Sequence, residues 1–302
     1  MGKNQSGFLL PLKALGILLL GGLLGGCQAS SYDRSHPAVS MDETRIRSIV
    51  IHYTQEEDDR SLEVLTAEEY PVSSHYLLSS KEDGKKPKIY QLVKDEARAW
   101  HAGVSGWRNR TNLNDTSIGI EIVYTIACDD GAKSSYETCT FPDFHPEQID
   151  VLIDLLGDLT KKYPSIQPLQ IIGHSDIAPV RKIDPGPRFP WQYLYSKGFG
   201  AWYDEAAMLR YLDVFKGAMP SPDEMNVALE DIGYNLDMSF DVDDEKELNY
   251  VIKAFQAHFV PHRISGVMDP LTAAVLFALR EKYGNGTEGY ETFCAASQIC
   301  AD

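Results

Sequence analysis

Short runs of β-branched residues alternate with segments of helical periodicity over the first part of the chain. Residues 45–54 (RIRSIVIHYT) hold a continuous apolar core that is typical of a buried strand, and this strand ends near His52. Residues 116–125 (TSIGIEIVYT) alternate, so that isoleucines occupy one face of a strand and Glu121 the other. Residues 169–176 (LQIIGHSD) predict another strand, which runs into a loop rich in proline and glycine.

Weaker patterns fill the intervals between these strands. Residues 73–80 and 88–94 predict two more strands, which a KEDGKKP turn joins. Residues 61–70 suit a helix, residues 145–163 place apolar side chains on one helical stripe, and residues 203–216 continue as helix. Strands that alternate with helices indicate an α/β domain.

A second pattern begins after the sequence MPSPDE at 219–224, where two prolines interrupt the helical periodicity. Three helices are predicted beyond this break, one within NVALEDIGY and two over 246–259 and 269–284. The C-terminal part of the chain is therefore expected to be a small, mostly helical domain.

The N-terminus has the pattern of a secretory signal. Residues 14–26 (ALGILLLGGLLGG) are apolar or glycine, a run too short for a membrane span, which takes about 20 apolar residues. The sequence LGGC at 24–27 resembles the lipobox of bacterial lipoproteins, in which cleavage precedes the cysteine, here Cys27, and lipid such as palmitate is added to it. A plain signal with a chance cysteine is the alternative. Gln28 favours the periplasmic face of the outer membrane as the lipid-anchored location.

The polar segment that follows the signal lacks periodicity and predicts a tether. We therefore expect a lipoprotein signal peptide at 1–26, a tether at 27–44, an α/β domain at 45–216, a linker at 217–222, a helical domain at 223–284 and a tail at 285–302.

Length and composition are those of an ordinary globular protein. The chain has 302 residues, 43% of them hydrophobic, which suffices for one large or two modest domains. The formal net charge is −16, from 28 Lys and Arg against 44 Asp and Glu. This balance argues against a nucleic-acid partner, because phosphate binding needs a basic surface. We interpret the acidity as a contribution to solubility and expect a monomer.

Four cysteines follow Cys27 in the sequence. Export implies an oxidising compartment, where an even number of cysteines favours disulfides. The local pairs Cys128–Cys139 and Cys294–Cys300 are the simplest of three possible connectivities. A cysteine-based zinc site is the alternative, although no CxxC spacing occurs.

Two histidines, His52 and His174, end predicted buried strands. If these strands are neighbours in a sheet, both imidazoles emerge at one edge, and the loop PVRKIDPGPRFPW brings Asp184 over them. Two imidazoles and one carboxylate suit Zn²⁺, with a fourth position open for water. The alternative is that each histidine has only a structural role.

A metal-assisted hydrolase also needs a base and a cation that faces the developing oxyanion. Glu121 is the candidate base, because a carboxylate on an exposed strand face among isoleucines has no packing role. Lys182, two residues before Asp184, is the candidate cation. His75 and His101 are candidates for orienting a metal ligand or contacting substrate.

Five segments together resemble the zinc-dependent N-acetylmuramoyl-L-alanine amidases of type 2, a family that includes phage amidases and peptidoglycan-recognition proteins. They are, in chain order, IVIHYT, SSHYLLS, ARAWHAG, SIGIEIV and GHSDIAPVRKIDPGPRFPW. The resemblance implies a mixed central sheet flanked by helices and one zinc ion per chain. The implied reaction is hydrolysis of the amide between N-acetylmuramic acid and L-alanine of the stem peptide in peptidoglycan or muropeptides.

The same resemblance assigns roles to individual residues. His52, His174 and Asp184 match the zinc ligands, and the Asp at 184, where some relatives carry Cys, places the chain in the bacterial branch. Glu121 matches the catalytic acid, and Lys182 the residue that stabilises the tetrahedral intermediate. The insert ACDDGAKSSYETCT is an elaboration that is expected to reshape the groove.

The C-terminal helices are similar to the three-helix peptidoglycan-binding domain in the segments ALEDIGY, AFQAHF and SGVMDPLTAAVL. A helical appendage that only packs on the enzyme is the alternative. Two other functions also stay open at this point. One is a non-catalytic muropeptide receptor on the same fold, and the other is a structural lipoprotein that tethers the envelope to the wall without metal.

Overall fold

The computed structural model describes residues 35–36, 38–41, 44–82, 84–236, 244–284 and 293. The expected signal peptide, Cys27, most of the tether and the Cys294–Cys300 pair lie outside these residues. The chain forms two compact units, Met1–Asp42 and Glu43–Asp302, and the described helices and strands belong to the second. Among the described helices, none has both the length and the apolar character needed to cross a membrane.

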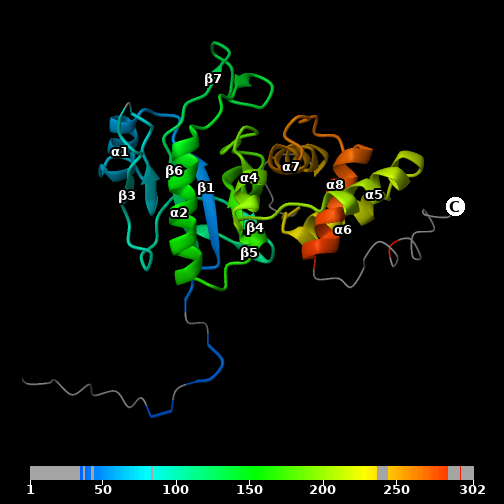
Figure 1. The fold of residues 1–302 in the computed structure, drawn as a ribbon, viewed down its shortest axis with the longest axis horizontal. Coiled ribbons are helices and arrows are strands. Elements are labelled where there is room, and N and C mark those ends of the chain that lie inside the picture. The colour runs from blue at the N-terminus through cyan, green and yellow to red at the C-terminus, as the bar shows by residue number, and fades with distance from the viewer. Residues whose placement is uncertain are drawn as a thin grey trace, which may run out of the picture. The chain divides into compact units, whose positions relative to one another are not determined.

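A five-stranded mixed sheet, with the order β3-β2-β6-β1-β9, lies in the N-terminal part of this unit (Figure 1). Its strands are β1 (Ser48–Tyr53), β2 (Tyr76–Leu78), β3 (Ile89–Gln91), β6 (Ser117–Ile122) and β9 (Ile171–Gly173). The pairs β1–β6, β1–β9 and β2–β6 are parallel, whereas β2–β3 is antiparallel. The mixed sheet that the family resemblance implied is thus confirmed.

The central strands are buried on both faces, as parallel strands usually are. Helix α2 (Pro146–Lys162) lies across the sheet and buries one apolar stripe there (Figure 1). The helix begins where the His145 side chain accepts a hydrogen bond from the amide of Glu147 and proline occupies the first position. Its last turn carries two lysines, whose positive charges interact favourably with the negative end of the helix dipole.

Shorter elements lie between these strands and directly after the last of them. They are α1 (Asp58–Thr66), α3 (His174–Ile177), α4 (Trp191–Ser196), the 3-10 turns η1 (Leu113–Asp115) and η2 (Pro168–Gln170), and the hairpins β4–β5 (Gly106–Trp107, Arg110–Thr111) and β7–β8 (Ala127–Cys128, Cys139–Thr140). Two expectations on boundaries were wrong. The helix expected over 61–70 begins and ends earlier, and the strand expected over 169–176 ends at Gly173, because the Asp176 carboxylate accepts a hydrogen bond from the Gly173 amide and starts a helical turn.

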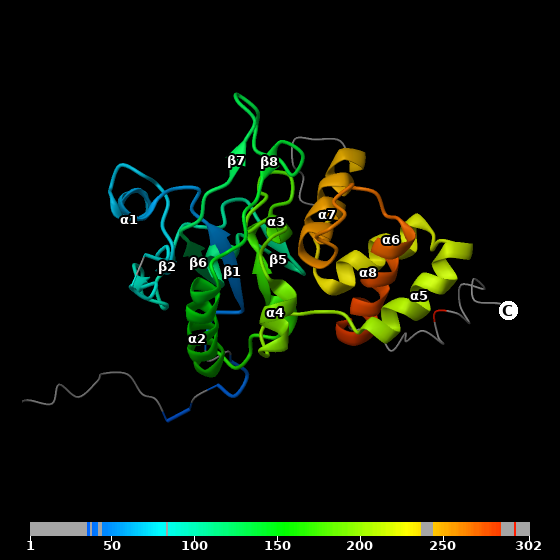
Figure 2. The ribbon, with the colours of Figure 1, turned by 45° about the horizontal axis from the view of Figure 1, so that its top comes forward.

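Four helices form the C-terminal part: α5 (Glu205–Gly217), α6 (Pro222–Ile232), α7 (Asp244–Phe259) and α8 (Pro270–Tyr283) (Figure 2). Ser221 and Glu224 form a capping box at the start of α6, which explains the break seen in the sequence. Helix α5 makes its most extensive contact with α8. The domain division at 217–222 stays a prediction, and α5 packs on a helix that lies beyond it.

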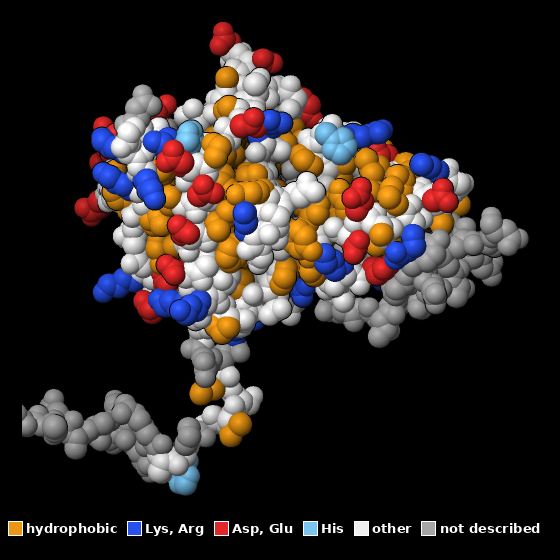
Figure 3. All heavy atoms as spheres, viewed as in Figure 1, with side chains coloured by type: hydrophobic (Ala, Val, Ile, Leu, Met, Phe, Trp, Pro, Cys, Tyr) orange, Lys and Arg blue, Asp and Glu red, His pale blue; other side chains and the backbone are white. Residues whose placement is uncertain are grey.

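One cluster of buried apolar side chains runs from the sheet into these helices. It includes Ile51 of β1, Leu156 of α2, Phe215 of α5 and Phe277 of α8. Lysines, arginines and acidic side chains are interspersed with apolar groups over the face drawn in Figure 3. The sheet and the C-terminal helices therefore share one core within the second unit.

Candidate zinc site and active-site groove

Strand register brings three of the predicted site residues to one edge of the sheet. His52 lies opposite Glu121 in the β1–β6 pair, and Ile51 lies opposite Gly173 in the β1–β9 pair. His174 directly follows Gly173, so both imidazoles emerge at the carboxyl ends of parallel neighbours. The expectation that the two histidine-bearing strands are adjacent is confirmed.

The loop after α3 returns Asp184 to the same edge. The amide of Ser175 donates to the carbonyl oxygen of Asp184 at 2.8 Å, which ties the loop to the first turn of α3. Gly173 allows this close approach, because a Cβ there would lie 2.6 Å from Cδ of Pro185. Asp184 is thus held over the two histidines by backbone contacts.

The donor atoms of these three residues form a small buried triangle. The Nδ1 atoms of His52 and His174 are 2.9 Å apart, and Oδ2 of Asp184 lies 3.2 Å and 3.1 Å from them. The residues are 1%, 3% and 7% exposed, in chain order. A tetrahedral zinc ion with bonds of about 2.0–2.1 Å separates its ligand atoms by about 3.3 Å. The triangle therefore has the size of one face of a zinc coordination shell.

Hydrogen bonds behind the triangle determine which nitrogens of His52 carry protons. Ser117 donates its hydroxyl to the carbonyl oxygen of Leu113, so it accepts from Nε2 of His101. In neutral His101, Nδ1 is then an acceptor, and Nε2 of His52 donates to it at 2.9 Å. Burial lowers the pKa of His101 well below its ordinary value and that of His52 to about 4. At neutral pH, Nδ1 of His52 is therefore left as a bare lone pair.

A backbone carbonyl orients His174 in the same way. Its Nε2 donates to the carbonyl oxygen of Ala102 at 3.2 Å, so its neutral form also presents an unprotonated Nδ1. Burial raises the pKa of Asp184, but interactions with His174 and His52 outweigh burial and hold that pKa far below its usual range. With both rings neutral, two lone pairs and a carboxylate oxygen thus converge, a set that fits a divalent cation such as Zn²⁺.

Glu121 lies beside the triangle with one oxygen unpaired. Its Oε1 is 4.0 Å from Nδ1 of His52, and its buried Oε2 has no hydrogen-bond partner among the described residues. Burial and the charge of Asp184 raise the pKa of Glu121 to about 8, although Lys182 opposes the shift. The expectation of an exposed strand face was wrong, because neighbouring chain covers this face and leaves the side chain only 13% exposed. A pKa near neutrality suits a group that accepts and later returns a proton.

Lys182 is half-buried in the wall of the same groove. Its charge lowers the pKa values of both Glu121 and His52. The neighbouring Arg181 is instead tied to the carbonyl oxygens of Ala102 and Val104. Lys182 is therefore a cation whose charge acts on the groups around the triangle.

These side chains line a groove of about 350 Å³. Apolar and aromatic side chains form its outer walls: Tyr53, Val64, Leu65, Val72 and Trp100. Val72 and Trp100 are 44% and 54% exposed, so the walls offer apolar surface to a ligand. A groove with apolar walls and a few converging polar groups is typical of a binding site for an organic substrate.

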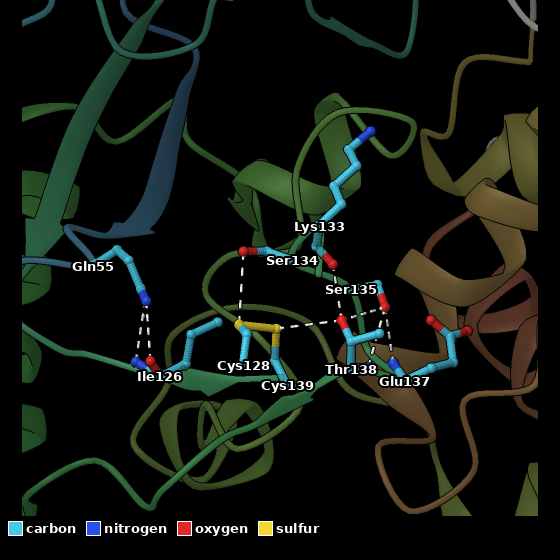
Figure 4. Close-up of a disulfide and its surroundings, with 9 residues drawn as sticks. All are labelled: Gln55, Ile126, Cys128, Lys133, Ser134, Ser135, Glu137, Thr138 and Cys139. Atoms are coloured by element: carbon cyan, nitrogen blue, oxygen red, sulfur yellow. Dashed lines mark hydrogen bonds between the residues drawn. A yellow bond between two sulfur atoms is a disulfide. The ribbon is translucent and has the colours of Figure 1, made fainter. Parts of the chain in front are cut away.

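The insert between β6 and α2 contributes to this groove. A disulfide between Cys128 and Cys139 closes the β7–β8 hairpin, which confirms the expected pair (Figure 4). Ser134 at its tip lines the groove, as does Gln55, whose side chain exchanges two hydrogen bonds with the backbone of Ile126. The insert therefore forms part of the groove wall.

The two further histidines have different surroundings. His101 lines the groove and contacts His52, so it is the one placed to orient a ligand. The His75 ring accepts from the amide of Gly119 and donates to the carbonyl oxygen of Ala97. His75 is fully buried in these backbone contacts and lies outside the set of groove-lining residues.

Sequence patterns did not reveal the groups that hold these histidines. Ser117 and the carbonyl of Ala102 have no distinguishing local signal, and Asn114 holds the amides of residues 101 and 102. Asp176 lies within the GHSD segment but was not singled out, although it organises the turn that carries His174. Its position in that segment was the one available signal.

Comparisons with known proteins show which chains this one resembles. The sequence profile of N-acetylmuramoyl-L-alanine amidase matches residues 42–187. The chain is 44% identical to N-acetylmuramoyl-L-alanine amidase AmiD of Escherichia coli K12 over 245 residues, which are 80% of this chain and 84% of AmiD. It is 38% identical to 1,6-anhydro-N-acetylmuramyl-L-alanine amidase AmpD of Haemophilus influenzae over 126 residues, 41% of this chain and 58% of AmpD.

Two solved structures extend the likeness to most of the fold. AmpDh3 of Pseudomonas aeruginosa in complex with an anhydromuramic pentapeptide has a TM-score of 0.75 at 41% identity, covering 83% of this chain and 97% of that one. E. coli AmiD in complex with anhydro-N-acetylmuramic acid-L-Ala-D-γ-Glu-L-Lys has a TM-score of 0.71 at 40% identity, covering 84% and 96%. Because the likeness to AmiD holds in sequence and in fold over most of both chains, this chain belongs to the N-acetylmuramoyl-L-alanine amidase family.

Proposed function

We propose that the chain is a zinc-dependent hydrolase that cleaves the amide bond between N-acetylmuramic acid and L-alanine of the stem peptide, in peptidoglycan or in muropeptides. The observation that carries this proposal is the convergence of three potential ligand atoms, from His52, His174 and Asp184, at an open groove. The two relatives solved with anhydromuramyl peptides support the same class of substrate here.

The residues around the triangle have different roles in hydrolysis. When bound there, Zn²⁺ supplies Lewis-acid polarisation of the scissile carbonyl and acidifies an adjacent water. Ionised Glu121 accepts a proton from the attacking water as the new C–O bond forms. It returns that proton to the nitrogen of L-alanine as the C–N bond breaks, so that the amine leaves in neutral form. Lys182 faces the carbonyl oxygen as negative charge develops, a contribution of about 3 kcal/mol.

We infer a location for the enzyme from its N-terminus. The LGGC sequence at 24–27 and Gln28 support lipid attachment at Cys27 and retention at the periplasmic face of the outer membrane. The tether at 27–44 then lets the domain at 45–216 reach the cell wall. The helices at 223–284, beyond the linker at 217–222, are proposed to bind peptidoglycan, on the likeness of their sequence to wall-binding domains.

Product analysis tests the proposed activity. The zinc-loaded protein is incubated with intact sacculi and with soluble anhydromuropeptides, and the products are identified by mass spectrometry. We expect free stem peptides that begin with L-alanine, loss of their release after EDTA, and recovery on addition of Zn²⁺. Release that persists when elemental analysis finds no metal would contradict the proposed chemistry. A zinc-loaded protein that binds muropeptides and releases no peptide would be a non-catalytic receptor instead.

A further inference from the structure

Two side chains from the C-terminal helices end on Asp176, two residues after the proposed ligand His174. The hydroxyl of Tyr234, which follows α6, donates to Oδ1 of Asp176 at 2.6 Å. Nδ1 of His258, in α7, donates to Oδ2 of Asp176 at 2.8 Å. The backbone amide of Gly173 donates to the same Oδ2, also at 2.8 Å. Two distant side chains and one neighbouring backbone amide thus donate to the same carboxylate.

This cluster is closed to solvent and rigidly packed. Asp176 is 2% exposed, Tyr234 1% and His258 4%. The imidazole of His258 stacks on Trp191 with ring centroids 3.9 Å apart, and Tyr234 packs edge-on against Trp107 at 5.0 Å. A carboxylate buried to this degree is costly unless hydrogen-bond donors surround it. Tyr234 and His258 are therefore needed to keep Asp176 in its place.

Asp176 in turn fixes the turn that carries the proposed metal ligands. Its bond to the Gly173 amide closes the first turn of α3, and His174 is the first residue of that helix. The next amide, that of Ser175, holds the backbone of Asp184. A displacement of Asp176 would move His174 and the Asp184 loop together, and metal sites lose affinity when such supporting contacts are removed.

We propose that Tyr234 and His258 are positioning residues of the zinc site, so that the C-terminal helices complete the active site of the amidase. This inference rests on the proposed function. The family profile ends at residue 187. Tyr234 and His258, which hold Asp176, therefore lie outside the segment that the profile matches. Neither residue is among those that line the groove, so substrate contacts are not expected to change with them.

The test compares metal binding by the full chain in Tyr234→Phe, which deletes one hydroxyl, and in His258→Leu, which deletes the imidazole donor. We expect the Kd for Zn²⁺, measured by competition with a chromophoric chelator, to rise about 10-fold or more in each variant. The visible spectrum of the Co²⁺-loaded protein should change as the ligands shift. At saturating zinc, kcat should fall while KM for a muropeptide stays near the wild-type value.

Two further variants separate positioning from a general loss of stability. Tyr283→Phe deletes a hydroxyl that donates to the carbonyl oxygen of Trp202, and it should leave metal affinity unchanged. His258→Asn keeps an N–H donor close to the position of Nδ1 and should recover most of the lost affinity. Wild-type affinity and Co²⁺ spectra in both Tyr234→Phe and His258→Leu would overturn the inference, as would an equal loss in Tyr283→Phe. If the wild-type chain itself binds no zinc, it is the proposed function that fails.

Discussion

The chemistry proposed for the groove depends on where single residues hold their protons. Neighbouring groups occupy the outer nitrogens of His52 and His174, which leaves the inner nitrogens free for a metal. Glu121 is placed differently, because one of its oxygens has no hydrogen-bond partner among the described residues and burial raises its pKa to about 8. In their neutral forms the two imidazoles thus turn unprotonated nitrogens inward, whereas Glu121 is able to take up and release a proton near neutral pH.

Glu121→Gln tests this difference. The amide matches the carboxylate in shape but cannot accept a proton, so kcat should fall by about 100- to 10,000-fold. Zinc content, measured by elemental analysis, should stay at the wild-type level, because Glu121 is not one of the three converging donors. Glu69→Gln, at an exposed position, should change neither quantity. Loss of zinc from Glu121→Gln would show that this residue is a ligand and not a base.

Gly119 gives a second prediction at the scale of one residue. A Cβ at this position would lie 2.4 Å from Cγ of the His101 ring, and that ring holds Nε2 of His52. Gly119→Ala should therefore displace the ring, weaken Zn²⁺ binding and lower the free energy of unfolding by about 1–3 kcal/mol. Chelator competition and urea unfolding measure the two effects.

Gly157→Ala is the matched control for this substitution. Gly157 lies within α2, and a Cβ there would meet only Cζ of Phe199, at an ordinary contact distance of 3.7 Å. Replacing a helical glycine by alanine should raise the free energy of unfolding by about 0.5–1 kcal/mol. Changes of the same sign in the two variants would contradict the proposed crowding at His101.

At the scale of helices and strands, the sequence predicts elements better than it predicts their partners. The strands β1 and β6 and the helix α2 lie within a few residues of their expected ranges, because burial imposes a strong periodicity on them. The packing of α5 on α8 has no such signal, since it joins segments far apart in the chain. The metal triangle was predictable because its histidines end recognisable strands. The contacts of Tyr234 and His258 with Asp176 were not, because no pattern in the segments of these two residues relates them to that edge of the sheet.

Asp95 shows how one carboxylate joins two elements. It is 1% exposed and accepts hydrogen bonds from the hydroxyls of Tyr76 in β2 and Tyr163 after α2. The ammonium group of Lys162 donates to it as well, at 2.7 Å. Burial raises the pKa of Asp95, but the hydrogen bonds from Lys162, Tyr76 and Tyr163 outweigh burial and hold that pKa below its ordinary value.

The direction of this shift predicts how stability depends on pH. A carboxyl whose pKa is lowered by folding stabilises the fold above its unfolded pKa of about 3.9, and that contribution is lost as pH falls through the folded value. Asp95→Asn should therefore lower the free energy of unfolding at pH 7 by about 1–3 kcal/mol, and the difference from wild type should narrow at pH 3. Urea unfolding of both proteins at pH 7 and pH 3 measures this difference. Asp150→Asn, at an exposed position of α2, should differ little from wild type at either pH. If Asp95→Asn lowers the free energy of unfolding by the same amount at both pH values, the ionised carboxylate of Asp95 is not the source of the effect.

At the scale of the second compact unit, α7 meets the catalytic part of the chain at two places. His258 donates a hydrogen bond to Asp176 in α3, and Lys253 pairs with Glu137 of the disulfide-closed hairpin at 2.5 Å. The same hairpin presents Ser134 to the groove. The C-terminal helices therefore touch both the support of the metal site and the wall of the groove, and the two contacts should affect different kinetic constants.

Removal of the disulfide tests the second of these contacts. The double variant Cys128→Ser/Cys139→Ser opens a loop with a sequence separation of 11, so the free energy of unfolding should fall by about 3 kcal/mol. KM for muropeptides should rise because the groove wall loosens, while the Kd for Zn²⁺ should stay unchanged, because His101 and the Ala102 carbonyl hold the ligand histidines.

Lys253→Met keeps the disulfide and removes only the ion pair to Glu137, so it should disturb the hairpin less than the double cysteine variant does. The pair lies at the surface, and its loss should cost about 0–1 kcal/mol of stability with a smaller rise in KM. An unchanged KM in both variants would mean that the hairpin does not shape the bound substrate. A higher Kd for Zn²⁺ in either variant would mean that the groove wall and the metal site are coupled. In that case α7 transmits a disturbance from Lys253 to His258 and from there to Asp176.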